Sequence, residues 1–233
     1  MEQIAYEHAG TALTGRLARP EGATRAAIVV FPTIANATEA VLRRARMLAS
    51  EGYLAFVADF YGEPISEPTH SRRMAEALWA DRPFYRARLG AALDAVRAMP
   101  EARGLPLATV GFCMGGGAVL EVARDGQDIA AAISFHGLLE TSAPAQPGAI
   151  TARLLVLHGD ADPMVPRSHV LAFWEEMDRA QADWHFHSYA NVRHGFTDPA
   201  SDERDLEAVA YDASADRQSW AAAMAFLEET LAG

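Results

Sequence analysis

The feature that most constrains the fold is the segment of residues 107–124, LATVGFCMGGGAVLEVAR. An apolar run leads to Gly111, the only cysteine of the chain follows at Cys113, and a stretch with helical spacing begins at Gly115. A strand that passes into a helix across Gly-x-Cys-x-Gly must reverse sharply, so the residues two before and two after the cysteine crowd each other and must be nearly free of side chain. The segment therefore predicts a strand–turn–helix unit that projects the cysteine sulfur above a sheet.

This turn gives Cys113 a candidate chemical role. Backbone N–H groups at a helix N-terminus favour negative charge, and such surroundings lower the pKa of a thiol and favour the nucleophilic thiolate. The pattern is a nucleophile elbow with cysteine in the serine position. The alternative is that Cys113 is a small buried apolar residue beside a glycine-rich turn. Dinucleotide and phosphate loops fit poorly, because Cys113 interrupts G-x-G-x-x-G and no Gly-Lys-Ser/Thr follows.

The whole chain shows the alternation of an α/β protein. Short β-branched apolar runs alternate with longer amphipathic stretches, which predicts a mostly parallel central sheet flanked by helices on both faces. The expected strands are residues 13–18 (an early edge strand), 26–31, 54–59, 107–111, 130–135, 154–158 and 184–189. The expected helices are residues 38–51, 71–79, 85–99, 115–124, 167–179 and 214–231. With 233 residues, half of them hydrophobic, we expect one domain over residues 1–233.

A nucleophile at such an elbow requires an acid and then a histidine later in the chain. Residues 154–166, LLVLHGDADPMVP, contain an expected strand and a turn with Asp160 and Asp162. We expect Asp162 to be the acid, because the following proline favours an extended backbone, and Asp160 to be a turn residue that bonds its own backbone. A turn or cap role for Asp162 stays open. His194, in the polar loop that follows the expected strand 184–189, is the expected base.

Composition narrows the class of partner. The formal net charge of −11 disfavours nucleic acid and anionic membranes as partners. It does not exclude a small anionic substrate, because one or two local arginines could still hold a carboxylate. One cysteine excludes an intrachain disulfide. The first residues, MEQIAYEHAG, lack a basic region followed by an apolar one, and no apolar run approaches the roughly 20 residues that span a bilayer. We therefore expect a cytoplasmic protein, and the sequence leaves its oligomeric state open.

Three motifs, VGFCMGG, HGDADPMVP and Y-x-x-x-x-H-G-F, together resemble the dienelactone hydrolase family of α/β-hydrolases. The similarity runs from residues 26–31 to the last helix. It implies an α/β-hydrolase fold and an ester or lactone hydrolase of the carboxymethylenebutenolidase type that needs no cofactor or metal. The site residues that it implies are the nucleophile Cys113, the acid Asp162, the base His194, and an oxyanion hole formed by the N–H groups of Ile34 and Met114.

Two positions depart from the family pattern. Thr33 stands where the archetypal enzyme has a glutamate that helps to generate the thiolate, and Asp198 stands where an arginine holds the substrate carboxylate. These departures favour neutral esters or lactones over substrates that carry a carboxylate. The candidate substrate-binding residues, chosen by loop position, are Thr33, Tyr61, Trp79, Phe84, His136 and Arg193. Ordinary core packing is an open alternative for the aromatic ones.

Other functions remain open at this point. One is a thioesterase or xenobiotic esterase that uses the same three residues. Another is a catalytically silent α/β-hydrolase that serves as a small-molecule binding module. A thiol redox protein is a further alternative, although without a second cysteine it would need an external thiol to resolve an oxidised Cys113.

Overall fold

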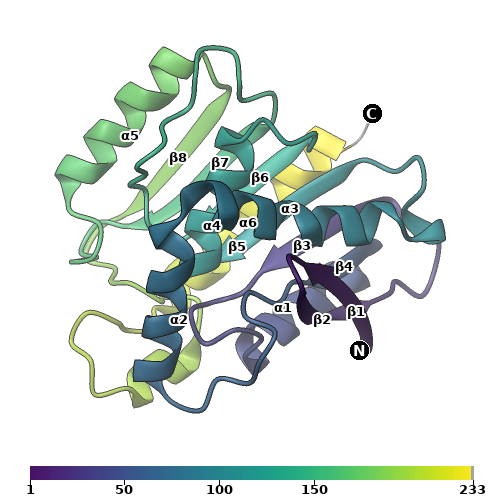
Figure 1. Cartoon of the computed structure of the whole chain (residues 1–233). Coiled ribbons are helices and arrows are strands. Elements are labelled where there is room, and N and C mark those ends of the chain that lie inside the picture. Colours follow the sequence, from purple (N-terminus) through teal and green to yellow (C-terminus); the bar gives the residue numbers. More distant parts are fainter. Residues whose placement is uncertain (232–233) are drawn as a thin grey trace. The chain divides into compact units, whose positions relative to one another are not determined.

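The computed structural model describes residues 1–231 of the chain. Strands and helices alternate along these residues (Figure 1), as the sequence predicts for an α/β protein. The residues form two compact units, whose boundary falls between Thr109 and Val110, inside strand β5 (Leu107–Phe112). Within residues 1–231, no helix is both long enough and apolar enough to cross a membrane.

The first unit contains four strands in the order β1-β2-β4-β3, followed by the beginning of β5. β1 (Glu2–His8) and β2 (Thr11–Ala18) pair antiparallel, and β2 also pairs antiparallel with β4 (Tyr53–Val57). β4 is parallel to β3 (Ala26–Phe31). Every residue of β3 and β4 is buried, as expected of parallel strands covered on both faces. The expectation of an edge strand at residues 13–18 is wrong, because β1 lies outside β2.

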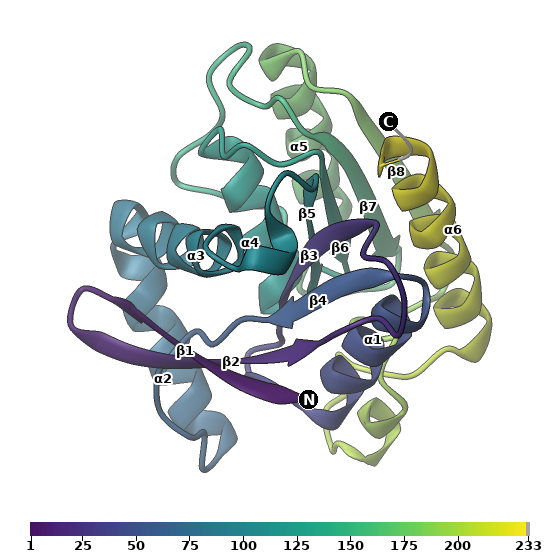
Figure 2. The same cartoon turned by 90° about the vertical axis from the view of Figure 1, so that its right-hand side faces the viewer.

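Two helices cover the strands of the first unit, and a third packs on one of them (Figure 2). α1 (Glu39–Ser50) packs against β2 and β4, and α3 (Arg82–Arg97) packs against β1 and β3. α2 (Pro68–Ala80) packs on α3. Both α2 and α3 begin a few residues earlier than the sequence predicts, with a proline in the first turn, where its missing N–H costs no helical hydrogen bond. A short 3₁₀ turn, Pro100–Ala102, leads on to β5.

The strands of the second unit follow the order β5-β6-β7-β8. β6 (Ala131–Phe135) is parallel to β7 (Arg153–Gly159), and β7 is parallel to β8 (Trp184–Tyr189). The carboxyl ends of parallel strands meet at one edge of a sheet, which is where α/β proteins bind their ligands. Loops that follow β5, β6, β7 and β8 therefore supply the candidate site of this unit.

The helices of the second unit lie on both faces of its strands. α4 (Met114–Arg124) packs on β6, and α6 (Ala213–Leu231) packs on β6 and β7. The ring of Phe173 in α5 (Arg167–Ala180) contacts Trp184 and Phe186, whereas Phe226 in α6 contacts His185. Because neighbouring residues of a strand point to opposite faces, α5 and α6 cover opposite faces of β8. A 3₁₀ turn, Pro199–Glu203, precedes α6.

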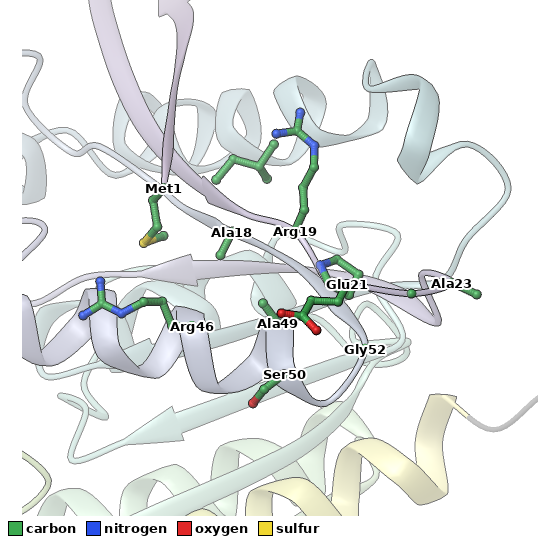
Figure 3. A pocket seen from close by; sticks show the side chains of 12 residues that line it. Met1, Ala18, Arg19, Glu21, Ala23, Arg46, Ala49, Ser50 and Gly52 are labelled. Carbon is green, nitrogen blue, oxygen red and sulfur yellow. The ribbon is translucent and has the colours of Figure 1, made fainter.

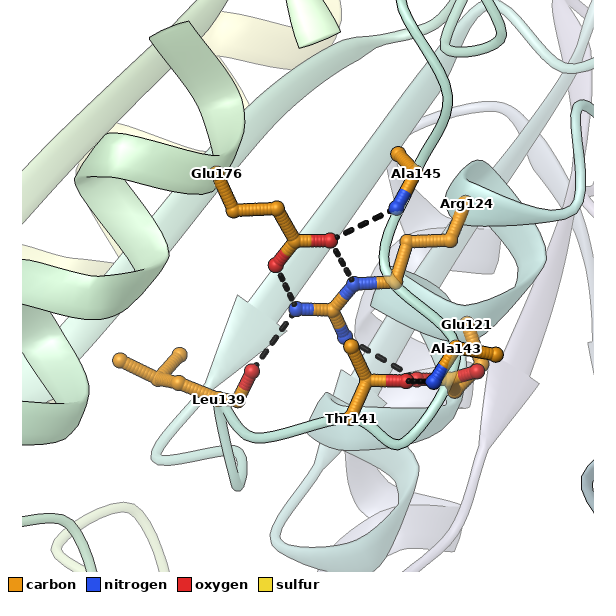
Figure 4. A network of polar contacts seen from close by, with 7 residues as sticks. All are labelled: Glu121, Arg124, Leu139, Thr141, Ala143, Ala145 and Glu176. Atoms are coloured by element: carbon orange, nitrogen blue, oxygen red, sulfur yellow. Dashed lines mark hydrogen bonds and ion pairs between the residues drawn. The ribbon is translucent and has the colours of Figure 1, made fainter. Parts of the chain in front are cut away.

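A buried ion-pair network fixes the long loop of residues 137–152 to the helices around it (Figure 4). Arg124 donates to both carboxylate oxygens of Glu176, at 2.9 and 2.7 Å, and to Glu121 at 3.1 Å. The same guanidinium donates to the Leu139 carbonyl at 2.7 Å, and Glu176 accepts the N–H of Ala145 at 3.0 Å. The loop is therefore attached at two points to α4 and α5.

A cavity of about 560 Å³ lies in the first unit, beside residues that precede β3 and β4 (Figure 3). Its two cationic side chains are already paired, Arg19 with Glu2 and Glu101, and Arg46 with Glu39. The cavity lies at the amino ends of β3 and β4, opposite to the ends where α/β proteins bind substrates. It is therefore a poor candidate for the functional site.

Candidate active site

Cys113 occupies the turn between β5 and α4, as the sequence predicts. It is the N-cap residue of α4 and has a φ of 56° and a ψ of −116°, a conformation that a residue with a side chain rarely adopts. A Cβ atom on Gly111 would collide with the backbone of Gly115 and Gly116, so only glycine fits there. Strain of this kind persists only where the surrounding structure enforces it. The local sequence thus holds the thiol at the start of a helix, where the helix dipole favours a thiolate.

Asp162 and His194 lie in the loops that follow β7 and β8, and their side chains are in contact. The Nδ1 atom of His194 lies 2.7 Å from Oδ2 of Asp162, and the other oxygen of Asp162 accepts the N–H of Met164 at 2.8 Å. Both side chains are buried. Asp160 is engaged elsewhere, in a two-pronged ion pair with Arg167 at 2.6 and 3.0 Å. The expectation that Asp160 bonds its own backbone is replaced by this ion pair, and the histidine partner is Asp162.

The charge state of His194 depends on Cys113. Burial disfavours the imidazolium, but the negative charge of Cys113 and the hydrogen bond with Asp162 outweigh it and raise the pKa of His194 to about 10. Nε2 of His194 makes no well-formed hydrogen bond within the described residues. The ring is nevertheless close enough to Cys113 for a charge on the sulfur to raise the pKa of His194. Catalytic hydrogen bonds are often loose before substrate binds. With Cys113 negatively charged, a pKa in this range keeps His194 protonated at neutral pH.

His136 connects the cysteine turn to the loop of His194. Its Nδ1 atom accepts the backbone N–H of Cys113 at 3.1 Å, and its Nε2 atom lies 2.8 Å from Oγ1 of Thr197. The His136 ring meets the His194 ring edge-on, with centroids 5.1 Å apart. The sequence places His136 in the substrate pocket, whereas the structure shows it 2% exposed with both ring nitrogens engaged by the protein. A contact with substrate stays a prediction.

The expected oxyanion residues lie in different units. Met114 is the first residue of α4, where backbone N–H groups point out of the helix. Ile34 belongs to the first unit, where its carbonyl accepts the hydroxyl of Tyr61 at 3.0 Å. Thr33 accepts the N–H of Ala35 through its side chain at 3.3 Å. The roles of Met114 and Ile34 in binding an oxyanion stay predictions.

Among the expected pocket aromatics, Phe84 is used in packing. Its ring contacts the His8 ring at 4.9 Å between centroids, and the Arg88 guanidinium lies 5.4 Å from its centre. This favours the core-packing alternative for Phe84. Tyr61 is buried and bonds the Ile34 carbonyl, whereas Trp79 on α2 is half-buried.

Asp59 is a residue that sequence reasoning missed. One of its carboxylate oxygens accepts Nδ2 of Asn36 at 2.8 Å and the N–H groups of Tyr61 and Gly62 at 2.9 and 3.0 Å. The other accepts the N–H of Thr14 at 2.9 Å. Asp59 thus fixes the loop after β4 to the loop after β3. The available signal was an acidic residue at the end of the expected apolar strand 54–59.

Arg193 and Asp198, the two charged residues near the position of the expected carboxylate clamp, each bond to another residue of the second unit. Arg193 is exposed and donates to the carbonyl of Glu207 at 3.0 Å. Asp198 accepts Arg204 at 2.7 Å and also caps the N–H of Ala200 at 3.0 Å. The charge of Asp198 is therefore partly neutralised, which the sequence did not predict. Arg193 as a substrate ligand stays a prediction.

The described part of the chain offers no cluster of metal ligands. Among residues 1–231, no three His, Cys, Asp or Glu side chains are grouped so that they could hold a metal ion. His185 and His187, which share a face of β8, are both exposed.

The comparison with known families agrees with this geometry. The model of the dienelactone hydrolase family matches residues 13–231. The chain belongs to this family. It therefore has an α/β-hydrolase fold and is a hydrolase, as the sequence motifs predict.

Similar proteins cover almost the whole chain. A solved structure titled m3DLH is 36% identical, with a TM-score of 0.92 over 98% of this chain and 97% of its own. The structure of P91, a dienelactone hydrolase-like promiscuous phosphotriesterase from metagenomic libraries, is 33% identical, with the same TM-score and coverage. A protein of Bradyrhizobium sp named as a probable 2-oxo-3-(5-oxofuran-2-ylidene)propanoate lactonase is 27% identical over 93% of this chain and 89% of its own.

Proposed function

We propose that this member of the dienelactone hydrolase family cleaves ester or lactone bonds by two-step acyl transfer through Cys113, His194 and Asp162. The observation that carries the proposal is the 2.7 Å hydrogen bond between Asp162 and His194, on a histidine whose pKa is raised by the charge of Cys113. An acid that orients a base beside a strained nucleophile is the general arrangement for covalent catalysis.

In the first step, the Cys113 thiolate attacks the carbonyl carbon of the substrate. The carbon–oxygen bond to the leaving group breaks, the alkoxide takes the proton of the His194 imidazolium, and a thioester remains on Cys113. In the second step, water gives a proton to His194 and attacks the thioester, so that the carboxylic acid leaves and the thiolate returns. Asp162 keeps the His194 ring in one orientation throughout.

The tetrahedral intermediates carry a negative oxygen that needs donors. The proposal assigns the N–H of Met114 to this role, because it follows the nucleophile at the start of α4. One such donor contributes about 3 kcal/mol to the transition state. The second donor that the family resemblance implies, the N–H of Ile34, stays a prediction.

We infer that the preferred substrates are neutral. Thr33 replaces the archetypal glutamate, and the position of the archetypal arginine holds Asp198, which is paired with Arg204. Arg193 is engaged by the Glu207 carbonyl. The Bradyrhizobium protein is named for a lactone that carries a carboxylate, and P91 for phosphotriesters, so both classes belong in a substrate panel.

The proposal is tested by rapid mixing with neutral chromogenic acyl esters, followed by an acid quench and mass spectrometry. The chain contains no lysine, so few residues compete with Cys113 for the acyl group and a mass increase is easily mapped. We expect a transient acyl group on Cys113, turnover of the ester, and neither with Cys113→Ala. A stable acyl group without turnover would indicate the silent binding module instead. Turnover in Cys113→Ala would refute the cysteine mechanism.

The panel also distinguishes the classes of acyl substrate. Thioesters and xenobiotic esters compete with lactones in the same assay, and the largest kcat/KM identifies the substrate class. The cytoplasm as compartment and a small molecule as the partner stay predictions.

A further inference from the structure

A buried hydrogen-bonded chain runs from the cysteine turn through His136 to Thr197, three residues after His194. The backbone N–H of Cys113 lies 3.1 Å from Nδ1 of His136 and is shared with the Phe135 carbonyl at 3.0 Å. The other ring nitrogen lies 2.8 Å from the Thr197 hydroxyl. His136 and Thr197 are 2% and 4% exposed, so water does not compete for these bonds. The proposed acyl-transfer steps assign no role to His136.

The donors fix which tautomer His136 adopts. The N–H of Cys113 can only donate, so Nδ1 of His136 must be an unprotonated acceptor. The proton of the neutral ring is then on Nε2, which donates to Oγ1 of Thr197. A doubly protonated ring could not accept from Cys113. The network thus specifies a neutral imidazole with one orientation.

The backbone at His136 bends so that its ring can form both hydrogen bonds. Its φ of 39° lies in the left-handed region, which costs on the order of 1–3 kcal/mol for a residue other than glycine. The following Gly137 passes so close to the first turn of α4 that a Cβ atom there would collide with Gly116. The bend brings the ring over the cysteine turn instead of letting it continue along β6.

We propose that His136 is a positioning residue that sets the distance between the nucleophile Cys113 and the base His194. His136 bonds the backbone N–H of Cys113 and the hydroxyl of Thr197, which lies on the loop of His194. Its ring also contacts the His194 ring edge-on, with centroids 5.1 Å apart. This inference rests on the proposed acyl transfer. A displacement of about 1 Å between reacting groups can lower a rate on the order of 100-fold.

The sharpest test changes Thr197, because it lies at the far end of the chain from the nucleophile. Thr197→Val keeps the shape and removes the acceptor for Nε2 of His136, whereas Thr197→Ser keeps the hydroxyl. We expect kcat to fall by up to about 100-fold in Thr197→Val with little change in KM, because a small displacement of the reacting groups can cost that much. Thr197→Ser is expected to recover most of the loss. Thr141→Val, which removes a local hydroxyl contact with Ala143 in the same unit, is the matched control.

His136 itself is tested with a pair of variants. His136→Asn tolerates a positive φ and retains an oxygen that can accept the N–H of Cys113, whereas His136→Phe keeps the ring and loses both bonds. We expect a larger loss of kcat in His136→Phe than in His136→Asn. Denaturant unfolding of each variant corrects the rates for the folded fraction. Equal losses in the paired variants, or a loss that appears only in KM, would overturn the proposal.

A second readout separates this inference from the proposed function. Alkylation of Cys113 by iodoacetamide needs the thiolate and no ester substrate. If His136 holds the thiol beside His194, the alkylation profile of Thr197→Val and His136→Phe moves to higher pH, while that of Thr141→Val follows the wild type. An unchanged profile in the folded variants refutes the positioning role. An inactive wild type with a shifted variant profile refutes ester hydrolysis and leaves the positioning role standing.

Discussion

Asp162 and His194 are 32 residues apart in the chain, yet Oδ2 of the first lies 2.7 Å from Nδ1 of the second, with both side chains buried. The parallel pairing of β7 and β8 causes this meeting, because it brings the loops after the two strands to the same edge. With Nδ1 held by the carboxylate, Nε2 is the nitrogen left for Cys113. The hydrogen bond therefore fixes the ring orientation that the proposed acyl transfer requires.

The first prediction compares the two aspartates of one turn. Asp162→Asn removes the group that orients His194, a change that costs on the order of 10⁴-fold where serine is the nucleophile, and we expect a smaller loss with the more acidic thiol. Asp160→Asn breaks an exposed ion pair with Arg167, and solvent screening makes such a pair contribute little to stability. The measurement is kcat/KM on one neutral ester. A greater loss in Asp160→Asn would show that the acid has been wrongly assigned.

The second prediction concerns the nucleophile. Cys113→Ala is expected to abolish ester hydrolysis while the far-ultraviolet circular dichroism stays that of the wild type, because alanine removes only the sulfur. Cys113→Ser is expected to retain a small part of the activity, since serine suits the same turn but its alkoxide needs a stronger base. Burst kinetics with a chromogenic ester measure both variants. Wild-type turnover in Cys113→Ala would place the nucleophile elsewhere.

The sequence predicts the elements whose signal is local. β3 and β8 have the predicted bounds, because each is an apolar or aromatic run closed by turn residues. β1 was missed, because its residues alternate between exposed and half-buried and give no apolar run. It is held in place by its partner β2 and by the turn at Ala9 and Gly10, which both have positive φ.

The candidate site likewise contains residues with a local sequence signal and residues that depend on contacts between distant segments. The positions of Cys113, Asp162 and His194 could be predicted because the turn after each strand has its own signature and the chain order is fixed by the fold. The bridge through His136 could not, since it depends on a bent backbone and on contacts with Cys113 and Thr197, 23 and 61 residues away. The buried network of Arg124 has no local signal either, because its partners are brought together only by tertiary packing.

That network gives the third prediction. Arg124→Met leaves Glu176 and Glu121 buried without their cation, and we expect it to lower the free energy of unfolding by about 3–5 kcal/mol. Replacing Glu121, Arg124 and Glu176 together by apolar residues of similar volume is expected to recover much of that loss. Urea titration measures both, and limited proteolysis reports release of residues 137–152. A single variant as stable as the wild type would show that the charges contribute nothing.

The fourth prediction concerns His158, which is 2% exposed and has no hydrogen bond on either ring nitrogen within the described residues. Burial lowers the pKa of His158 by more than Asp162 and Asp160 raise it. The unfolded chain takes up a proton near pH 6.5 that the folded protein does not, so stability falls as the pH falls below that value. The slope from this one group is at most about 1.4 kcal/mol per pH unit.

His158→Phe is expected to remove this part of the slope, because phenylalanine fills the site beside Phe186 and takes up no proton. His8 and His187, whose pKa values are also lowered, keep their contributions in His158→Phe. The control is His70→Gln on α2, because His70 is remote in the chain from these histidines and does not affect their pKa values. Unfolding free energies measured at several pH values below neutrality give the slopes. A slope in His158→Phe equal to that of the control would show that His158 is protonated in the folded protein.

The last prediction concerns substrate charge, and compares a dienelactone carboxylate with its methyl ester. We expect the ester to have the larger kcat/KM by about 10-fold or more, because a charge-assisted hydrogen bond to a substrate carboxylate is worth about 1.5–3 kcal/mol and its arginine is replaced by Asp198. The net charge of −11 supplies no attraction at long range. The pairing of Asp198 with Arg204 reduces local repulsion without providing a clamp, since that guanidinium is already bound. A larger kcat/KM for the free acid would show that another arginine binds the carboxylate, and Arg193→Met would then be the first variant to measure.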